Sequence, residues 1–137
     1  MILVTGAGGK TGKAVIRALV TRGAPVRALV RSSVHEAVLK KMGVNEVVAG
    51  ELSDPRALSQ ATRGTEAIYH ICPNVSPHEV SFAKALVDSA ARFGMPRLVY
   101  HSVLHPQIEA MPHHWNKLRV EELSLIHISE PTRQAEI

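Results

Sequence analysis

The stretch that decides the fold lies near the start of the chain and reads Val4-Thr5-Gly6-Ala7-Gly8-Gly9-Lys10-Thr11-Gly12. It follows an apolar run that favours a β-strand, and it precedes a segment whose apolar residues recur at helical spacing. The spacing Gly6-x-x-Gly9-x-x-Gly12 is intact, whereas the G-x-G-x-x-G frame fails because position 11 is threonine. A glycine-rich turn between a strand and a helix is typical of a dinucleotide-binding loop.

Glycines allow the backbone to turn tightly and to approach a pyrophosphate, and the free amides at the start of a helix attract its negative charge. We therefore predict a pyrophosphate-binding loop built from Gly6, Gly9, Lys10, Thr11 and Gly12. The alternative is a glycine-rich β–α turn that holds no ligand.

Short β-rich runs alternate with helical patterns along the rest of the chain, which predicts an α/β fold with a doubly wound parallel sheet. The expected strands lie near residues 2–5, 26–30, 46–49, 67–71 and 97–101. Helices are expected between the first two strands, at 34–42, from Pro55 behind the capping residues Ser53 and Asp54, at 77–93, and from His113 or His114 onward.

The end of the second expected strand indicates which nucleotide is bound. Sites that prefer NAD usually carry an acidic residue there, but this strand ends in Val30-Arg31-Ser32-Ser33. A guanidinium binds phosphate through two hydrogen bonds, so Arg31, helped by Lys10 and the two serine hydroxyls, favours the 2′-phosphate of NADP. NAD is the second option, and the alternative for Arg31 is an ordinary solvated arginine.

Composition narrows the class of protein. The chain has 137 residues and a net charge of +4, but its basic residues are scattered and only 4% of residues are aromatic, so we expect no nucleic-acid partner. No apolar run approaches the roughly 20 residues that span a membrane, and no secretory signal is visible. With a single cysteine, Cys72, the expectation is a cytoplasmic protein without a disulfide. The histidines show no metal-binding spacing, so no metal site is predicted.

Two further segments belong with the glycine loop and Arg31: Gly50-Glu51-Leu52-Ser53-Asp54 and His114-Trp115-Asn116-Lys117-Leu118-x-x-Glu121. Together they resemble the NmrA-like group of atypical short-chain dehydrogenase/reductases, over about residues 1–122. The resemblance implies that Glu51 and Leu52 border the adenine, although the family more often has Asp at the first of these positions. It also implies that the loop Cys72-Pro73-Asn74 lines the nicotinamide side, with Pro73 as a cofactor contact.

Active members of the larger superfamily use Tyr-x-x-x-Lys, in which tyrosine supplies a proton and lysine holds the nicotinamide ribose. Here His113 stands in the tyrosine position, so the resemblance carries over Lys117 as a cofactor contact but no tyrosine mechanism. The catalytic residues stay open, with Ser102, His113 and Lys117 as candidates. The alternatives are a loop-capping serine and a partly exposed histidine.

The last segment, from Leu123 through Pro131, has no turn to separate it from the preceding helix. It resembles the translation of a transposon-end adaptor used in sequencing libraries. We therefore expect an incomplete NAD(P)-binding domain at 1–122 and a non-native tail at 123–137. The sixth strand and the C-terminal substrate-binding part of the family would then be missing.

Two functions are compatible with these features. The first is an NADP(H)-binding oxidoreductase fragment, inactive by itself, whose full-length parent transfers hydride between NADPH and a small carbonyl or quinone. The second is a non-catalytic NAD(P) sensor or regulatory protein, which the missing tyrosine keeps open. The substrate and the oligomeric state cannot be read from these residues.

Overall fold

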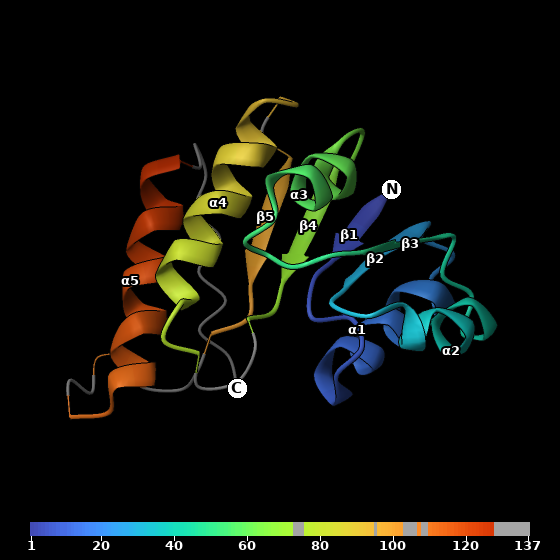
Figure 1. Ribbon diagram of the computed structural model, residues 1–137, viewed down its shortest axis with the longest axis horizontal. Coiled ribbons are helices and arrows are strands. Elements are labelled where there is room, and N and C mark those ends of the chain that lie inside the picture. Colours follow the sequence, from blue (N-terminus) through green and yellow to red (C-terminus); the bar gives the residue numbers. More distant parts are fainter. Residues whose placement is uncertain (73–75, 95, 103–106, 108–109, 128–137) are drawn as a thin grey trace.

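A computed structural model describes residues 1–72, 76–94, 96–102, 107 and 110–127. Its centre is a parallel sheet of five strands in the order β3-β2-β1-β4-β5 (Figure 1). The strands are β1 (Ile2–Val4), β2 (Val26–Val30), β3 (Glu46–Ala49), β4 (Ala67–His70) and β5 (Arg97–Tyr100). Because all pairs are parallel, the carboxyl ends of the strands meet at one edge, where doubly wound sheets bind ligands.

Helices cover both faces of the sheet (Figure 1). One face carries α1 (Lys10–Thr21) and α2 (Glu36–Lys41), and the other carries α3 (Pro55–Thr62) and α4 (Glu79–Ala91). The last helix, α5 (Pro112–His127), packs along α4. A 3-10 turn, η1 (Ser33–His35), precedes α2. The predicted doubly wound fold is therefore confirmed.

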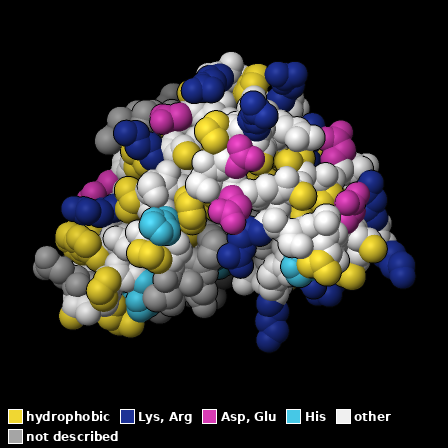
Figure 2. Space-filling model, in the orientation of Figure 1, with side chains coloured by type: hydrophobic (Ala, Val, Ile, Leu, Met, Phe, Trp, Pro, Cys, Tyr) yellow, Lys and Arg dark blue, Asp and Glu magenta, His cyan; other side chains and the backbone are white. Residues whose placement is uncertain are grey.

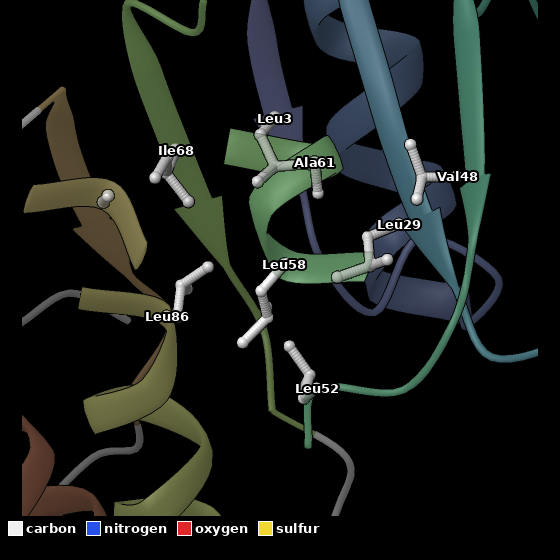
Figure 3. Packing of buried hydrophobic residues seen from close by; sticks show 9 residues of the cluster. Leu3, Leu29, Val48, Leu52, Leu58, Ala61, Ile68 and Leu86 are labelled. Atoms are coloured by element: carbon white, nitrogen blue, oxygen red, sulfur yellow. The ribbon is translucent and has the colours of Figure 1, made fainter. Parts of the chain in front are cut away.

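The strands alternate their side chains between two cores, as a sheet buried on both faces requires. Leu3 of β1 packs toward α3 and α4, whereas the next residue, Val4, packs toward α1 and α2. Figure 3 shows the first of these cores, with Leu58 and Leu86 reaching the sheet from α3 and α4. This packing fixes the strand ends that carry the loops of the site.

The predicted strands agree with the observed ones to within one residue at each end. The helix expected from residue 34 begins instead at Glu36, because the Ser32 side chain caps η1 first. The expected cap of α3 is observed, since the Asp54 carboxylate accepts a hydrogen bond from the Arg56 amide at 2.9 Å. In the described part of the chain, no helix is long and apolar enough to span a membrane.

Candidate active site

The glycine loop turns directly after β1, and two of its glycines are required by the chain itself. Gly6 adopts a left-handed φ of 62°, which side chains disfavour. A Cβ at position 12 would lie 2.2 Å from the carbonyl oxygen of Gly6, so the first turn of α1 can pack on the loop only if residue 12 is glycine.

Gly9, the middle glycine, is not required by the local backbone. Gly9 is the N-cap of α1 and has extended backbone angles that any residue can adopt, φ −81° and ψ 172°. A Cβ there would make one ordinary contact, 3.5 Å from the Gly6 carbonyl oxygen. Nothing in the described structure therefore requires glycine at position 9, and the space above it belongs to a cavity.

This cavity has a volume of about 930 Å³ and runs across the carboxyl ends of the strands. Every predicted cofactor-binding residue that the structure describes lines it: Gly6, Gly9, Lys10, Thr11, Gly12, Arg31, Glu51, Leu52 and Lys117. Ser102 lines it as well, whereas His113 is not among the lining residues. The predicted contact Pro73 lies outside the described residues.

The end of β2 contributes one lining residue that sequence reasoning missed. His35 of η1 lies beneath the loop, because a Cβ on Gly8 would fall 2.9 Å from its Cδ2 atom. The Ser32 hydroxyl already accepts a hydrogen bond from the Val34 amide at 3.3 Å. Of the two serines expected to help Arg31, Ser32 lines the cavity and Ser33 does not.

At the opposite end of the cavity, a buried ion pair holds Lys117 of α5. Its Nζ atom donates to Oε1 of Glu79 at 2.5 Å, and the lysine and glutamate side chains are only 7% and 0% exposed. The Tyr100 hydroxyl, at the end of β5, donates to the same oxygen. Burial and the neighbouring carboxylate raise the pKa of Tyr100 well above its usual value, so its hydroxyl stays protonated.

Two more buried groups extend this cluster toward the glycine loop. The His70 ring stacks on Tyr100 with centroids 5.6 Å apart, and its Nδ1 atom lies 2.8 Å from the hydroxyl oxygen of Thr5. Burial, assisted by the positive charge of Lys117, lowers the pKa of His70 to about 3. The imidazole is therefore neutral at ordinary pH and acts as a packing and hydrogen-bonding group.

The remaining polar groups at this end differ in their partners. The Ser102 hydroxyl is buried and finds no hydrogen-bond partner among the described residues. Cys72 is buried, and burial together with the charge of Glu79 raises the pKa of its thiol to about 12, which makes it a poor nucleophile. His101 lies 3.1 Å from the Tyr69 hydroxyl through Nδ1. In the described ranges, no three His, Cys, Asp or Glu side chains are grouped to hold a metal.

Sequence reasoning missed Glu79, Tyr100 and His70 because they come from three separate elements. Glu79 sits in the first turn of α4, where an acidic residue is commonplace and gives no sign of burial. The one available signal was Lys117 itself, since a buried ammonium requires a counter-charge. Which carboxylate supplies that charge depends on how α4 and α5 pack.

Comparison with known proteins identifies the family to which the chain belongs. A family model described as the NmrA-like family matches residues 1–128. The chain belongs to this family. The resemblance predicted from the glycine loop and the lysine-bearing helix is thereby confirmed.

Similar sequences include an NAD(P)H azoreductase of Xenophilus azovorans, 36% identical over 112 residues, which cover 82% of this chain and 37% of the relative. Another is sterol demethylase protein B of Methylococcus capsulatus, 34% identical over 128 residues, with coverages of 82% and 38%.

Among solved structures, the NADPH complex of an NADPH-dependent quinone oxidoreductase from Escherichia coli superposes with a TM-score of 0.81 at 24% identity. A short-chain dehydrogenase/reductase superfamily protein from Agrobacterium tumefaciens with bound NAD gives 0.71 at 30% identity. A triphenylmethane reductase of Citrobacter sp. complexed with NADP(H) gives 0.81 at 24% identity. Each of these matches covers 93% of this chain and between 44% and 46% of the other chain.

The chain thus spans less than half of the length of these relatives. The family match runs to residue 128 and α5 runs to His127, both beyond the predicted domain boundary at 122. The boundary and the non-native tail at 123–137 stay predictions, and residues 128–137 lie outside the described part.

Proposed function

We propose that this chain is the dinucleotide-binding part of an NADP(H)-dependent oxidoreductase whose full-length parent transfers hydride between NADPH and a small carbonyl or quinone. The observation that carries the proposal is Gly9. The chain leaves room for a side chain there, yet the residue is glycine and faces the cavity at the start of α1. A pyrophosphate lying on the helix amides explains that choice.

The proposed assignment of the cavity follows its two ends. Arg31 and Lys10 line the end near β2 and would hold the 2′-phosphate, since both are exposed cations beside the loop. Glu51 and Leu52 would border the adenine. Lys117, with Pro73, would contact the nicotinamide side. Of the three similar structures named above, the Escherichia coli quinone oxidoreductase is in complex with NADPH and the Citrobacter reductase with NADP(H), whereas the Agrobacterium protein holds NAD.

A bound nicotinamide dinucleotide would supply the hydride chemistry, and this chain would bind it, orient it and exclude water. The names of the relatives support a small molecule that accepts electrons, since they include an azoreductase, a quinone oxidoreductase and a triphenylmethane reductase. Of these names, the quinone oxidoreductase agrees directly with the proposed substrate class. Ser102 is the proposed contact on the substrate side, because the residue lines the cavity and its hydroxyl lacks a partner among the described residues.

The second candidate is an NAD(P) sensor without catalysis. One observation favours it: the one described tyrosine hydroxyl near Lys117, that of Tyr100, donates its proton into Glu79. A tyrosine engaged in this way is a poor acid. In this case, the nucleotide would bind and the occupied state would be read by a partner.

Titration with NADPH and a panel of quinones separates the two functions. We expect the 137-residue chain to bind NADPH, and the full-length parent to oxidise NADPH in the presence of a quinone. Binding without any quinone-dependent oxidation by the parent would favour the sensor. Failure of both proteins to bind NADPH or NADH would overturn the proposal.

The remaining assignments concern partners and location. We propose a cytoplasmic protein that acts on a small molecule and does not bind nucleic acid. On the face seen in Figure 2, Lys and Arg side chains are dispersed among acidic and apolar ones. This dispersed arrangement does not favour binding of the phosphate backbone of a nucleic acid. Duplex DNA binding that weakens steeply with salt would contradict this.

A further inference from the structure

The buried pair of Glu79 and Lys117 is unusual because burying two charges carries a large desolvation cost. Removing two charges from water costs several kcal/mol for each ion, and a well-packed apolar pair would often stabilise the fold as well. Within the described structure, the second oxygen of the carboxylate, Oε2 of Glu79, has no hydrogen-bond partner. Stability alone is a weak reason for placing these charges between α4 and α5.

Only one member of the cluster reaches the cavity. Lys117 is among the lining residues, whereas Glu79 and Tyr100 are not. The lysine is 5% exposed, so its position is set by the protein and not by solvent. Glu79 and Tyr100 therefore stand behind Lys117, on the side away from the ligand.

We propose that Glu79 and Tyr100 are positioning residues that hold the Lys117 ammonium at a fixed point of the dinucleotide cavity. Glu79 supplies the counter-charge. Tyr100 donates to the same carboxylate oxygen and limits where that oxygen can lie. The inference rests on the proposed function, since it names what prepares the lysine for the nucleotide.

The hydrogen-bond inventory of the ammonium supports this arrangement. Lys117 has three N–H donors: one is directed to Glu79 at 2.5 Å, and a second lies toward the Tyr100 oxygen at 3.5 Å. The ammonium also lies 5.4 Å from the centroid of the Tyr100 ring. Within the described part of the chain, these contacts use two of the three donors and leave the third for a ligand in the cavity, such as a ribose hydroxyl.

Among the described residues, the titratable groups around Lys117 come from α4, α5, β4 and β5 and from the residues that follow these two strands. They are Glu79 of α4, Tyr100 of β5, His70 of β4, the adjacent Cys72 and His101, and Glu121 of α5. His70 and Cys72 are neutral near pH 7 because burial opposes their charged forms. Glu79 is the carboxylate in contact with the ammonium, so its removal should change the electrostatic environment of Lys117 directly.

The test is the pH dependence of NADPH binding by the 137-residue chain, comparing wild type with Glu79→Gln. A buried ammonium without its carboxylate releases its proton more readily as the pH rises. We expect the ratio of the two dissociation constants to grow from below threefold at pH 6 to about tenfold at pH 9. A role confined to folding would weaken binding by the same factor at every pH.

A control and a double variant complete the design. Glu36→Gln breaks an exposed glutamate–lysine pair on α2, with Lys40 at 3.6 Å, and should leave the pH profile unchanged. In a Lys117→Met background, the added Glu79→Gln change should have no pH-dependent effect on binding. If Glu79→Gln alone does not fold, Tyr100→Phe keeps both charges and removes only the hydroxyl that donates to Glu79. It should weaken NADPH binding, and unchanged binding by a folded Tyr100→Phe protein would overturn the inference.

Three outcomes are distinguishable. A pH-dependent loss in Glu79→Gln that vanishes with Lys117→Met supports the inference. A flat ratio, or a pH-dependent loss that persists without the lysine, overturns it while leaving NADPH binding intact. Wild-type protein that binds neither NADPH nor NADH overturns the proposed function instead.

Discussion

At the scale of single residues, the three glycines of the loop have different reasons to be glycine. Gly6 needs its positive φ, and Gly12 needs to lie against the backbone of the loop. Gly9 has neither need, and its absent side chain leaves the cavity open there. Substitution can therefore separate the proposed binding role of the motif from its structural role.

Gly9→Ala should weaken NADPH binding at least tenfold, because the added methyl group occupies the space above the helix amides. The free energy of unfolding should fall by no more than about 1 kcal/mol, the size of an N-cap effect. Fluorescence titration with NADPH and urea denaturation measure the two quantities. Unchanged affinity would mean that the pyrophosphate does not lie over Gly9.

Arg31→Ala tests the choice of nucleotide. We expect NADPH affinity to fall about 10- to 100-fold, the effect of losing charge-assisted hydrogen bonds to phosphate, while NADH affinity changes little. Arg22→Ala is a matched control, since Arg22 lies exposed at the other end of α1 and donates to the Ala18 carbonyl. Equal losses for both nucleotides would argue against a 2′-phosphate contact.

At the scale of elements, strands and helices could be predicted because their signals are local. The apolar runs of the strands and the capping carboxylate of Asp54 lie within a few residues of the structure that they specify. The glycine loop was predicted in the same way, from a contiguous motif, whereas Lys117 was predicted from the resemblance to the NmrA-like group. By contrast, Glu79 and Tyr100 meet Lys117 only through the packing of α4, β5 and α5, which no local pattern encodes.

The close packing of α1 against the glycine loop gives a prediction at the scale of elements. A Cβ at Gly12 would lie 2.2 Å from the Gly6 carbonyl oxygen, so Gly12→Ala must displace the helix or the loop. We expect the free energy of unfolding to fall by at least about 2 kcal/mol, an overpacking effect. Urea denaturation measures this change, and a cost below that of Gly9→Ala would contradict it.

At the scale of the whole molecule, hydrogen bonds and ring contacts link β1 to α5 through the interior. Thr5 contacts His70, His70 stacks on Tyr100, and Tyr100 shares the Glu79 oxygen with Lys117. The neutral imidazole at the centre of this series makes folding sensitive to acid.

The unfolded chain protonates His70 near pH 6.5, whereas the folded chain resists protonation until about pH 3. The free energy of unfolding should therefore fall as the pH drops through that window, by about 2 kcal/mol from this group between pH 7 and pH 5. His70→Asn should lose this part of the pH dependence. Parallel urea titrations at the two pH values measure it, and identical slopes for both proteins would rule out His70 as the source.

The sheet itself predicts poor behaviour in solution for the isolated chain. β5 pairs only with β4 in the described structure, which leaves a strand edge open to association. We expect the 137-residue protein to be marginally stable and to aggregate as its concentration or the temperature rises, as light scattering and thermal denaturation would show. The binding and urea titrations are therefore made at low protein concentration. A sample that stays monodisperse at high concentration and resists thermal denaturation would refute this.

The contrast among the three glycines also bears on how related sequences are expected to evolve. A lineage that abandoned the nucleotide but kept the fold would be released from glycine at position 9, while positions 6 and 12 would stay constrained by the polypeptide. Related sequences that are substituted only at the middle glycine would then be those that have lost nucleotide binding. Retention of all three would mark chains still under selection to hold a dinucleotide, whether or not they catalyse a reaction.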